Sequence, residues 1–320
     1  MAWHVVEPGP QSTVQDLGRP GYQRFGVPVS GAMDEFALRA ANLLAGTPPA
    51  AAALEFVFQG PLLAVDADCL VALCGGNPRL RVDGRDLPGW QGVRVRAGQA
   101  IQPVIGPNAA WGYLSVSGGL DVPLVLGSAS TYLRGGFGGL EGRPLRAGDR
   151  LFSRTEGRFP AELAGARLAS PGKFQSGQSI EVCVVPGPQE DWFGEEGLSA
   201  LLTGEYTLLP ESDRMGYRLQ GPPIPRRAGD LLSEGMAPGS IQVPPNGQPI
   251  VMMADRPTTG GYPKIGTVIH ADLPCLAQLR PGSGVVRFRA VSVEEAQAAY
   301  RDSLNQLVLE SDADELWMQA

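Results

Sequence analysis

Short glycine- and proline-framed segments recur in the same order in the two halves of this sequence. Pro8-Gly9-Pro10-Gln11 returns as Pro186-Gly187-Pro188-Gln189, and Arg19-Pro20-Gly21-Tyr22 returns as Arg214-Met215-Gly216-Tyr217. One such match would be coincidence, but ordered matches indicate an internal duplication. The length of 320 residues suits two domains of ordinary size. The sequence therefore predicts two tandem copies of one fold.

Each copy is predicted to be mainly β with a few helices. The 43 glycines and 29 prolines separate short apolar or alternating runs, as in a turn-rich β protein. Three helices are expected: one over 33–44, one from 188 to about 202, and one from the capping box at Ser292 to about residue 304. The clearest predicted strands cover 70–74, 93–96, 113–117, 180–185, 250–253 and 285–291.

The domain boundary is expected in the small, polar stretch between residues 165 and 180. We predict a first lobe over 1–170, a second lobe over 171–308, and an acidic tail over 309–320 that frays.

Charge and hydropathy exclude several classes of protein. The net charge of −7 and the absence of a basic cluster do not fit a nucleic-acid-binding protein. The chain shows no signal peptide and no apolar run of membrane-spanning length. The four cysteines are not spaced as metal ligands and are expected to be reduced, which predicts a cytoplasmic protein.

Two candidate polar loops lie in the first half. One contains Gln15, Asp16, Arg19 and Tyr22 among glycines, and its polar side chains suit either substrate binding or a turn held by an Asp16–Arg19 ion pair. The other places Ser128 and Ser130 before the glycine-rich segment 135–139. This second loop is either an anion-binding nest or a flexible hairpin.

Two further candidate loops lie in the second half. Arg214 and Tyr217, followed by Ser233 and Glu234, fit recognition of a carboxylate or phosphate, or alternatively a surface ion-pair network. The segment 253–264 is the strongest candidate, because an apolar strand leads into many different donors and acceptors. The candidate residues there are Asp255, Arg256, Thr258, Thr259, Gly260, Gly261, Tyr262 and Lys264.

Several catalytic signatures are missing from the sequence. There are only two histidines and no His-x-x-x-His pattern, so no metal site is predicted. No Gly-x-Ser-x-Gly elbow, phosphate-binding loop or biotin-attachment sequence occurs. The chain is thus predicted to carry no covalently bound cofactor.

These segments resemble the biotin-dependent carboxyltransferase family over roughly residues 3 to 295. The resemblance rests on residues 9–19, Ser30-Gly31-Ala32-Met33-Asp34, residues 41–44, Leu54-Glu55, residues 212–217, 239–244 (which adds Gln242 to the candidates), 247–250 and 255–262. It implies two cyclophilin-like β-barrel lobes.

The family includes several activities, and the resemblance leaves them open. The leading expectation is the C subunit of an ATP-dependent 5-oxoprolinase, which helps open a lactam with PxpA-like and PxpB/KipI-like partner subunits that use ATP. A carboxyltransferase that moves a carboxyl group to urea or a related amide, from biotin on a partner protein, is the first alternative. A KipA-like regulatory binding protein without turnover is the second.

The resemblance also implies a site for a small amide or lactam in a cleft between the lobes. Arg19, Arg214 and Thr258 with Thr259 would hold carboxylate or amide oxygens there, and Asp255 or Lys264 would assist proton transfer. Asp255, Lys264 and Arg214 are the catalytic candidates. Ala129 and Pro257 stand where the family pattern has an arginine and a glutamine, so two hydrogen-bonding side chains are missing.

Overall fold

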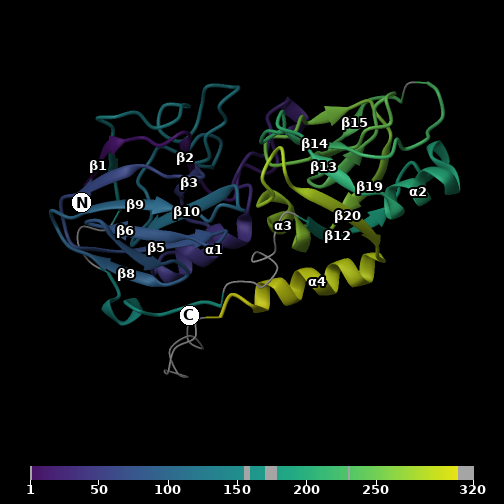
Figure 1. Cartoon of the computed structure of the whole chain (residues 1–320). Helices are drawn as coiled ribbons and strands as arrows, with labels where there is room; N and C mark the ends of the chain where they lie inside the picture. Colours follow the sequence, from purple (N-terminus) through teal and green to yellow (C-terminus); the bar gives the residue numbers. More distant parts are fainter. Residues whose placement is uncertain (1, 155–158, 170–178, 230, 309–320) are drawn as a thin grey trace.

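The computed structural model describes residues 2–154, 159–169, 179–229 and 231–308. Two groups of strands lie side by side, with helix α4 (Val293–Asn305) running along one side of the molecule (Figure 1). Strands β1 to β11 form the first lobe and strands β12 to β20 the second. The predicted boundary at residue 170 and the predicted tail over 309–320 lie outside the described residues.

The first lobe is built from two antiparallel sheets. The six-stranded sheet has the order β11–β1–β4–β9–β6–β7, and the five-stranded sheet has the order β2–β3–β10–β5–β8. Their strands are β1 (Ala2–Glu7), β2 (Ser12–Gln15), β3 (Ala53–Val57), β4 (Leu62–Val65), β5 (Cys69–Gly75), β6 (Arg79–Val82), β7 (Arg85–Pro88), β8 (Gly92–Val95), β9 (Ala100–Val104), β10 (Trp111–Val116) and β11 (Arg150–Phe152).

The five-stranded sheet is buried on both faces. One face, with Val14, Leu54 and Leu114, packs against the six-stranded sheet. The opposite face, with Ala72 and Tyr113, packs on helix α1 and belongs to a core that continues into the second lobe. The face that carries Thr13, Gln15 and Glu55 therefore looks toward the lobe interface.

The second lobe is a closed barrel with the order β12–β19–β16–β17–β14–β13–β20. A separate two-stranded sheet, β15–β18, stands beside it. The strands are β12 (Ser179–Pro186), β13 (Tyr206–Leu208), β14 (Gly216–Gln220), β15 (Glu234–Gly235), β16 (Ser240–Gln242), β17 (Ile250–Met252), β18 (Thr259–Gly260), β19 (Lys264–Val268) and β20 (Val285–Ala290). The mainly β fold is thus confirmed, with barrel closure in the second lobe and two facing sheets in the first.

The helices match the predicted positions closely. Helix α1 (Glu35–Leu44) begins at Asp34, whose carboxylate accepts the Ala37 N–H at 2.8 Å. Helix α2 (Gly194–Thr203) follows Pro188, and α4 begins with the predicted Ser292–Glu295 capping box. The sequence patterns missed α3 (Leu273–Ala277), because one short turn shows no helical periodicity. Short 3-10 turns cover Gln23–Phe25, Ala161–Leu163, Glu190–Trp192 and His270–Asp272.

Candidate functional site

Asp16 forms a buried polar centre inside the first lobe. Its carboxylate accepts hydrogen bonds from the Ser128 and Ser130 hydroxyls at 2.6 and 2.5 Å, and from the Gly18 and Ala129 N–H groups at 2.7 and 2.6 Å. Four donors satisfy the charge without a cation, which is how a buried carboxylate is tolerated. This network fixes the loop over 127–131 against the end of β2.

Arg19 lies beside that centre but does not pair with Asp16. It donates instead to the Ser130 carbonyl and, at 3.4 Å, to the Val125 carbonyl, and it lies 5.0 Å over the Phe137 ring. Burial lowers the pKa of Arg19, although Asp16 and Asp255 oppose the shift. Within the described structure, its Nη1 has no hydrogen-bond partner. The Asp16–Arg19 ion pair considered from the sequence therefore does not form.

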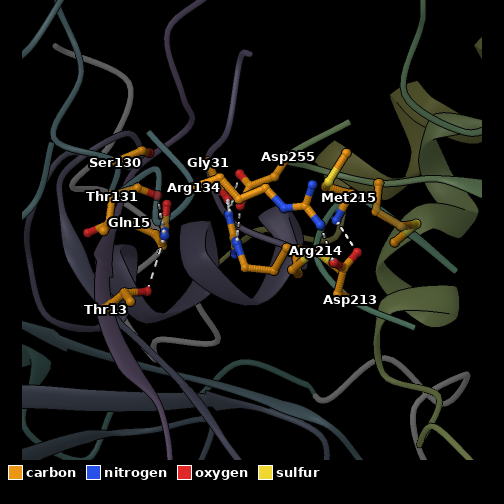
Figure 2. A network of polar contacts seen from close by, with 12 residues as sticks. Thr13, Gln15, Gly31, Ser130, Thr131, Arg134, Asp213, Arg214, Met215 and Asp255 are labelled. Atoms are coloured by element: carbon orange, nitrogen blue, oxygen red, sulfur yellow. Dashed lines mark hydrogen bonds and ion pairs between the residues drawn. The ribbon is translucent and has the colours of Figure 1, made fainter. Parts of the chain in front are cut away.

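Arg214 is the corresponding arginine of the second lobe, and it joins the two lobes. Its Nε and Nη2 donate to the two Asp255 carboxylate oxygens at 2.9 and 3.2 Å, and Nη1 contacts Glu55 of the first lobe. Nη2 also donates to the Gly31 carbonyl at 2.6 Å (Figure 2). Burial would lower the pKa of Arg214, but the Asp255 and Glu55 carboxylates outweigh it and raise the pKa, so the guanidinium stays protonated.

Carboxylates of the first lobe complete the interface around Arg214. Glu55 accepts from the Tyr113 hydroxyl at 2.7 Å and the Met33 N–H at 2.8 Å, and burial raises its pKa. Asp34 accepts from Gln278 of the second lobe at 2.7 Å. Burial raises the pKa of Asp34 to about 7.

Aromatic side chains extend the same interface. The Trp111 indole N–H donates to the Tyr217 hydroxyl at 3.1 Å, and that hydroxyl donates to the Ala277 carbonyl at 2.8 Å. The Arg214 guanidinium carbon also lies over the Trp111 ring, 5.9 Å from the centre of the ring. The lobes are thus held together by directional polar contacts in addition to apolar packing.

A cavity of about 520 Å³ opens between the lobes beside this network. Arg214, Asp255, Trp111 and Tyr217 line it together with apolar side chains from both lobes. Arg134 lines the same cavity and also an adjoining hollow of about 790 Å³ on the second lobe. The volume and the mixture of apolar walls with a few polar groups suit a small ligand.

Lys264 and Glu234 belong to a different polar cluster, at one end of the barrel. Lys264 Nζ lies 2.5 Å from Glu234 Oε1, which also accepts from Gln189 at 2.6 Å. Gln242 is buried nearby and donates to the Tyr262 carbonyl at 3.3 Å. Because none of these residues lines the cavity between the lobes, Lys264 is not grouped with Asp255 there.

The remaining candidates are dispersed around the small β15–β18 sheet. Arg256 is buried, its pKa is lowered by burial, and it donates to the Met236 carbonyl at 3.0 Å. Thr259 and Gly260 pair with Gly235 and Glu234 in that sheet. Ser233 and Tyr262 are exposed, Tyr22 is half-buried, and Thr258 and Gly261 are partly buried.

The structure therefore divides the predicted residues into three places. Asp16, Arg19, Ser128 and Ser130 form one centre, with Gln15 held nearby between Thr13 and Thr131 at 3.1 Å (Figure 2). Arg214, Tyr217 and Asp255 meet at the cavity. The third group lies at the Lys264–Glu234 contact and around the adjoining β15–β18 sheet, and Tyr22 stands apart from all three, at the start of the 3-10 turn Gln23–Phe25. The sequence patterns missed Glu55, Trp111, Arg134, Asp34 and Gln278 as interface residues. Two signals were present: Asp34 and Glu55 both lie within family segments, and Glu55 is a charged residue inside a buried strand.

Comparison with known proteins settles the family. The sequence profile described as carboxyltransferase domain, subdomain A and B, matches residues 25–290. This chain belongs to that carboxyltransferase family. It is 37% identical over 315 residues to the 5-oxoprolinase C subunit of Haemophilus influenzae, covering 96% of this chain and 99% of the relative. It is 40% identical over 301 residues to that of Escherichia coli, covering 93% and 94%.

A solved member of the carboxyltransferase family has the same fold. The crystal structure of the Kluyveromyces lactis urea carboxylase superposes with a TM-score of 0.87 at 28% identity, over 96% of this chain. The chain corresponds to only 29% of that larger protein. The predicted family and mainly β fold are confirmed.

The two departures from the family pattern have different settings. Ala129 is buried in the first-lobe core, and it contributes only its backbone N–H to the Asp16 carboxylate. Pro257 lines the hollow beside Arg134.

Across the described ranges, no group of three His, Cys, Asp or Glu side chains is arranged to hold a metal ion. None of the helices described has the length and apolar character needed to cross a bilayer.

Proposed function

We propose that this chain is the C subunit of an ATP-dependent 5-oxoprolinase, acting in a cytoplasmic complex with PxpA-like and PxpB/KipI-like subunits. The observation that carries the proposal is its end-to-end similarity to two 5-oxoprolinase C subunits, at 37–40% identity. In the overall reaction the lactam C–N bond breaks and the elements of water are added across it, giving glutamate, with ATP hydrolysis supplied by the complex.

The cavity between the lobes is the proposed substrate site. A lactam presents one planar amide, which requires a donor and an acceptor placed on rigid elements. The walls of the cavity hold the Arg214 guanidinium and the Asp255 carboxylate side by side at 2.9 Å, above the Trp111 ring. In this proposal Asp255 moves the proton of the amide and Arg214 orients Asp255.

The test is 5-oxoproline-dependent ATP hydrolysis and glutamate release by the reconstituted complex, with this chain added or omitted. Asp255→Asn keeps the shape of the side chain but removes its basicity, and should lower kcat by about 100-fold or more. Lys264→Met is the matched comparison at the other polar cluster and should have a much smaller effect. Equal turnover with and without this chain would contradict the proposal.

A carboxyltransferase acting on urea is the second candidate, because the fold superposes on a urea carboxylase with a TM-score of 0.87. That activity would require a partner protein that carries biotin. Carboxylation of urea that depends on the biotinylated partner, without 5-oxoproline turnover, would favour this candidate.

A further inference from the structure

Arg134 reaches across the opening between the lobes, and its hydrogen-bonding capacity is unused within the described structure. Its nearest charged partner is Asp213 of the second lobe, with Nη2 and Oδ2 separated by 3.6 Å (Figure 2). This distance is too long for a hydrogen bond, and both side chains are more than half exposed. The planar guanidinium therefore retains the paired N–H groups that bind a carboxylate most strongly.

The position of Arg134 is fixed by the first-lobe polar centre. Arg134 lies in a tight hairpin in which Tyr132 and Phe137 form a β-bridge and their rings pack at 5.5 Å. Phe137 in turn lies against Arg19, 5.0 Å from its guanidinium. Gly138 allows this approach, because a Cβ there would lie 2.0 Å from the Ser130 carbonyl oxygen. The buried centre thus supports the hairpin that presents Arg134 to the cavity.

The other cations near the cavity are less suited to a ligand carboxylate. Among the described residues that line it, the cations are Arg134 and Arg214. Arg214 already makes four hydrogen bonds to protein oxygens, out of the five N–H groups that an arginine has. Arg218 is exposed and lines only the adjoining hollow.

We propose that Arg134 binds the carboxylate of the substrate, so that the cavity selects a small lactam acid over a neutral lactam or amide. This inference rests on the proposed function, since 5-oxoproline carries a carboxylate beside its lactam. The ligand carboxylate takes the place of Asp213 as the partner of Arg134. Asp213 can give up that role, because its Oδ1 remains bonded to the Met215 and Gly216 N–H groups at 2.8 and 3.3 Å.

The experiment compares wild type, Arg134→Ala and the matched control Arg218→Ala, each as the purified chain and in the reconstituted complex. Binding of 5-oxoproline and of 2-pyrrolidinone, which has the same ring without the carboxylate, is measured by ligand-observed NMR titration, and turnover by glutamate release. Arg134→Ala should weaken 5-oxoproline binding, and raise its KM, by roughly 10- to 100-fold. Binding of 2-pyrrolidinone should be unchanged, and Arg218→Ala should behave as wild type.

The outcomes separate this inference from the proposed function. Wild-type binding of 5-oxoproline that is lost in Arg134→Ala, without any turnover by the complex, would support Arg134 and reject the 5-oxoprolinase assignment. Turnover of 5-oxoproline with an unchanged KM in Arg134→Ala would support the 5-oxoprolinase assignment and reject the role of Arg134. Loss of affinity in Arg218→Ala instead would place the carboxylate in the outer hollow and overturn the inference. A wild-type protein that neither binds nor turns over 5-oxoproline would overturn both.

Discussion

Arg19 and Arg214 occupy matching positions in the two sequence repeats, yet they have opposite surroundings. Arg19 stays within its lobe, donates to backbone carbonyls and has its pKa lowered by burial. Arg214 crosses to the other lobe, contacts two carboxylates and has its pKa raised by them. Both lie near an aromatic ring, Phe137 for one and Trp111 for the other.

The comparison shows how one repeated arginine serves two purposes. In the first lobe the neighbouring carboxylate, Asp16, is satisfied by neutral donors, so Arg19 can support a hairpin. Around Arg214, by contrast, the Asp255 carboxylate of the second lobe and the Glu55 carboxylate of the first lobe both depend on the arginine itself, so these contacts join the two lobes. The cavity lies beside Arg214 because that is where the two lobes share a charged network.

The same substitution at both arginines should give the largest contrast. Arg214→Met leaves Glu55 and Asp255 buried without their cation and should lower the free energy of unfolding by about 3–5 kcal/mol. Arg19→Met leaves only carbonyls unpaired and should cost about 1–3 kcal/mol. Urea denaturation of both variants measures the difference. As a control, Glu55→Gln and Asp255→Asn, added to Arg214→Met, neutralise the unpaired carboxylates and should restore part of the lost free energy of unfolding. Equal losses of stability in Arg214→Met and Arg19→Met would show that the two arginines do not differ in this way.

Asp34 should make the stability of the lobe interface depend on pH. Burial raises its pKa from 3.8 to about 7, so the folded state keeps a proton that the unfolded state releases near pH 4. The free energy of unfolding should therefore fall, by an amount on the order of a few kcal/mol, as the pH rises from about 4 to about 7.

Asp34→Asn tests this directly, because asparagine is also a good N-cap residue and cannot titrate. Denaturation midpoints across that pH range should show a smaller slope in the variant than in wild type. Slopes that are the same in both proteins would show that Asp34 titrates normally in the folded state.

The repeat-equivalent tyrosines should give the smallest contrast. Tyr217→Phe removes the hydroxyl that links Trp111 to the Ala277 carbonyl and should cost about 1–2 kcal/mol. Tyr22→Phe should change stability by less than about 0.5 kcal/mol, because Tyr22 is only half-buried and its hydroxyl has no protein partner within the described ranges. Thermal unfolding of both variants measures the effect. Comparable destabilisation by the two would indicate that Tyr22 also has a structural partner.

Local patterns in the sequence were sufficient to predict the longer helices and the clearest strands of the fold. The alternation at 93–96 and the apolar run at 70–74 fall in β8 and β5, and the Ser292 capping box starts α4. Each of these signals depends on residues a few positions apart, so it can be seen without knowing the tertiary structure. The family segments likewise predicted the two-lobe β architecture.

The grouping of the candidate residues was decided only by the tertiary structure. Arg214 meets Glu55 across 159 positions of sequence, and Gln278 meets Asp34 across 244. No periodicity encodes such contacts, because they depend on how the two lobes dock. The sequence by itself therefore determined the mainly β class, the longer helices, the family and several of the polar residues that surround the cavity. Docking of the lobes decided which of them face the cavity, since a buried charge is stable only where the fold supplies its partner.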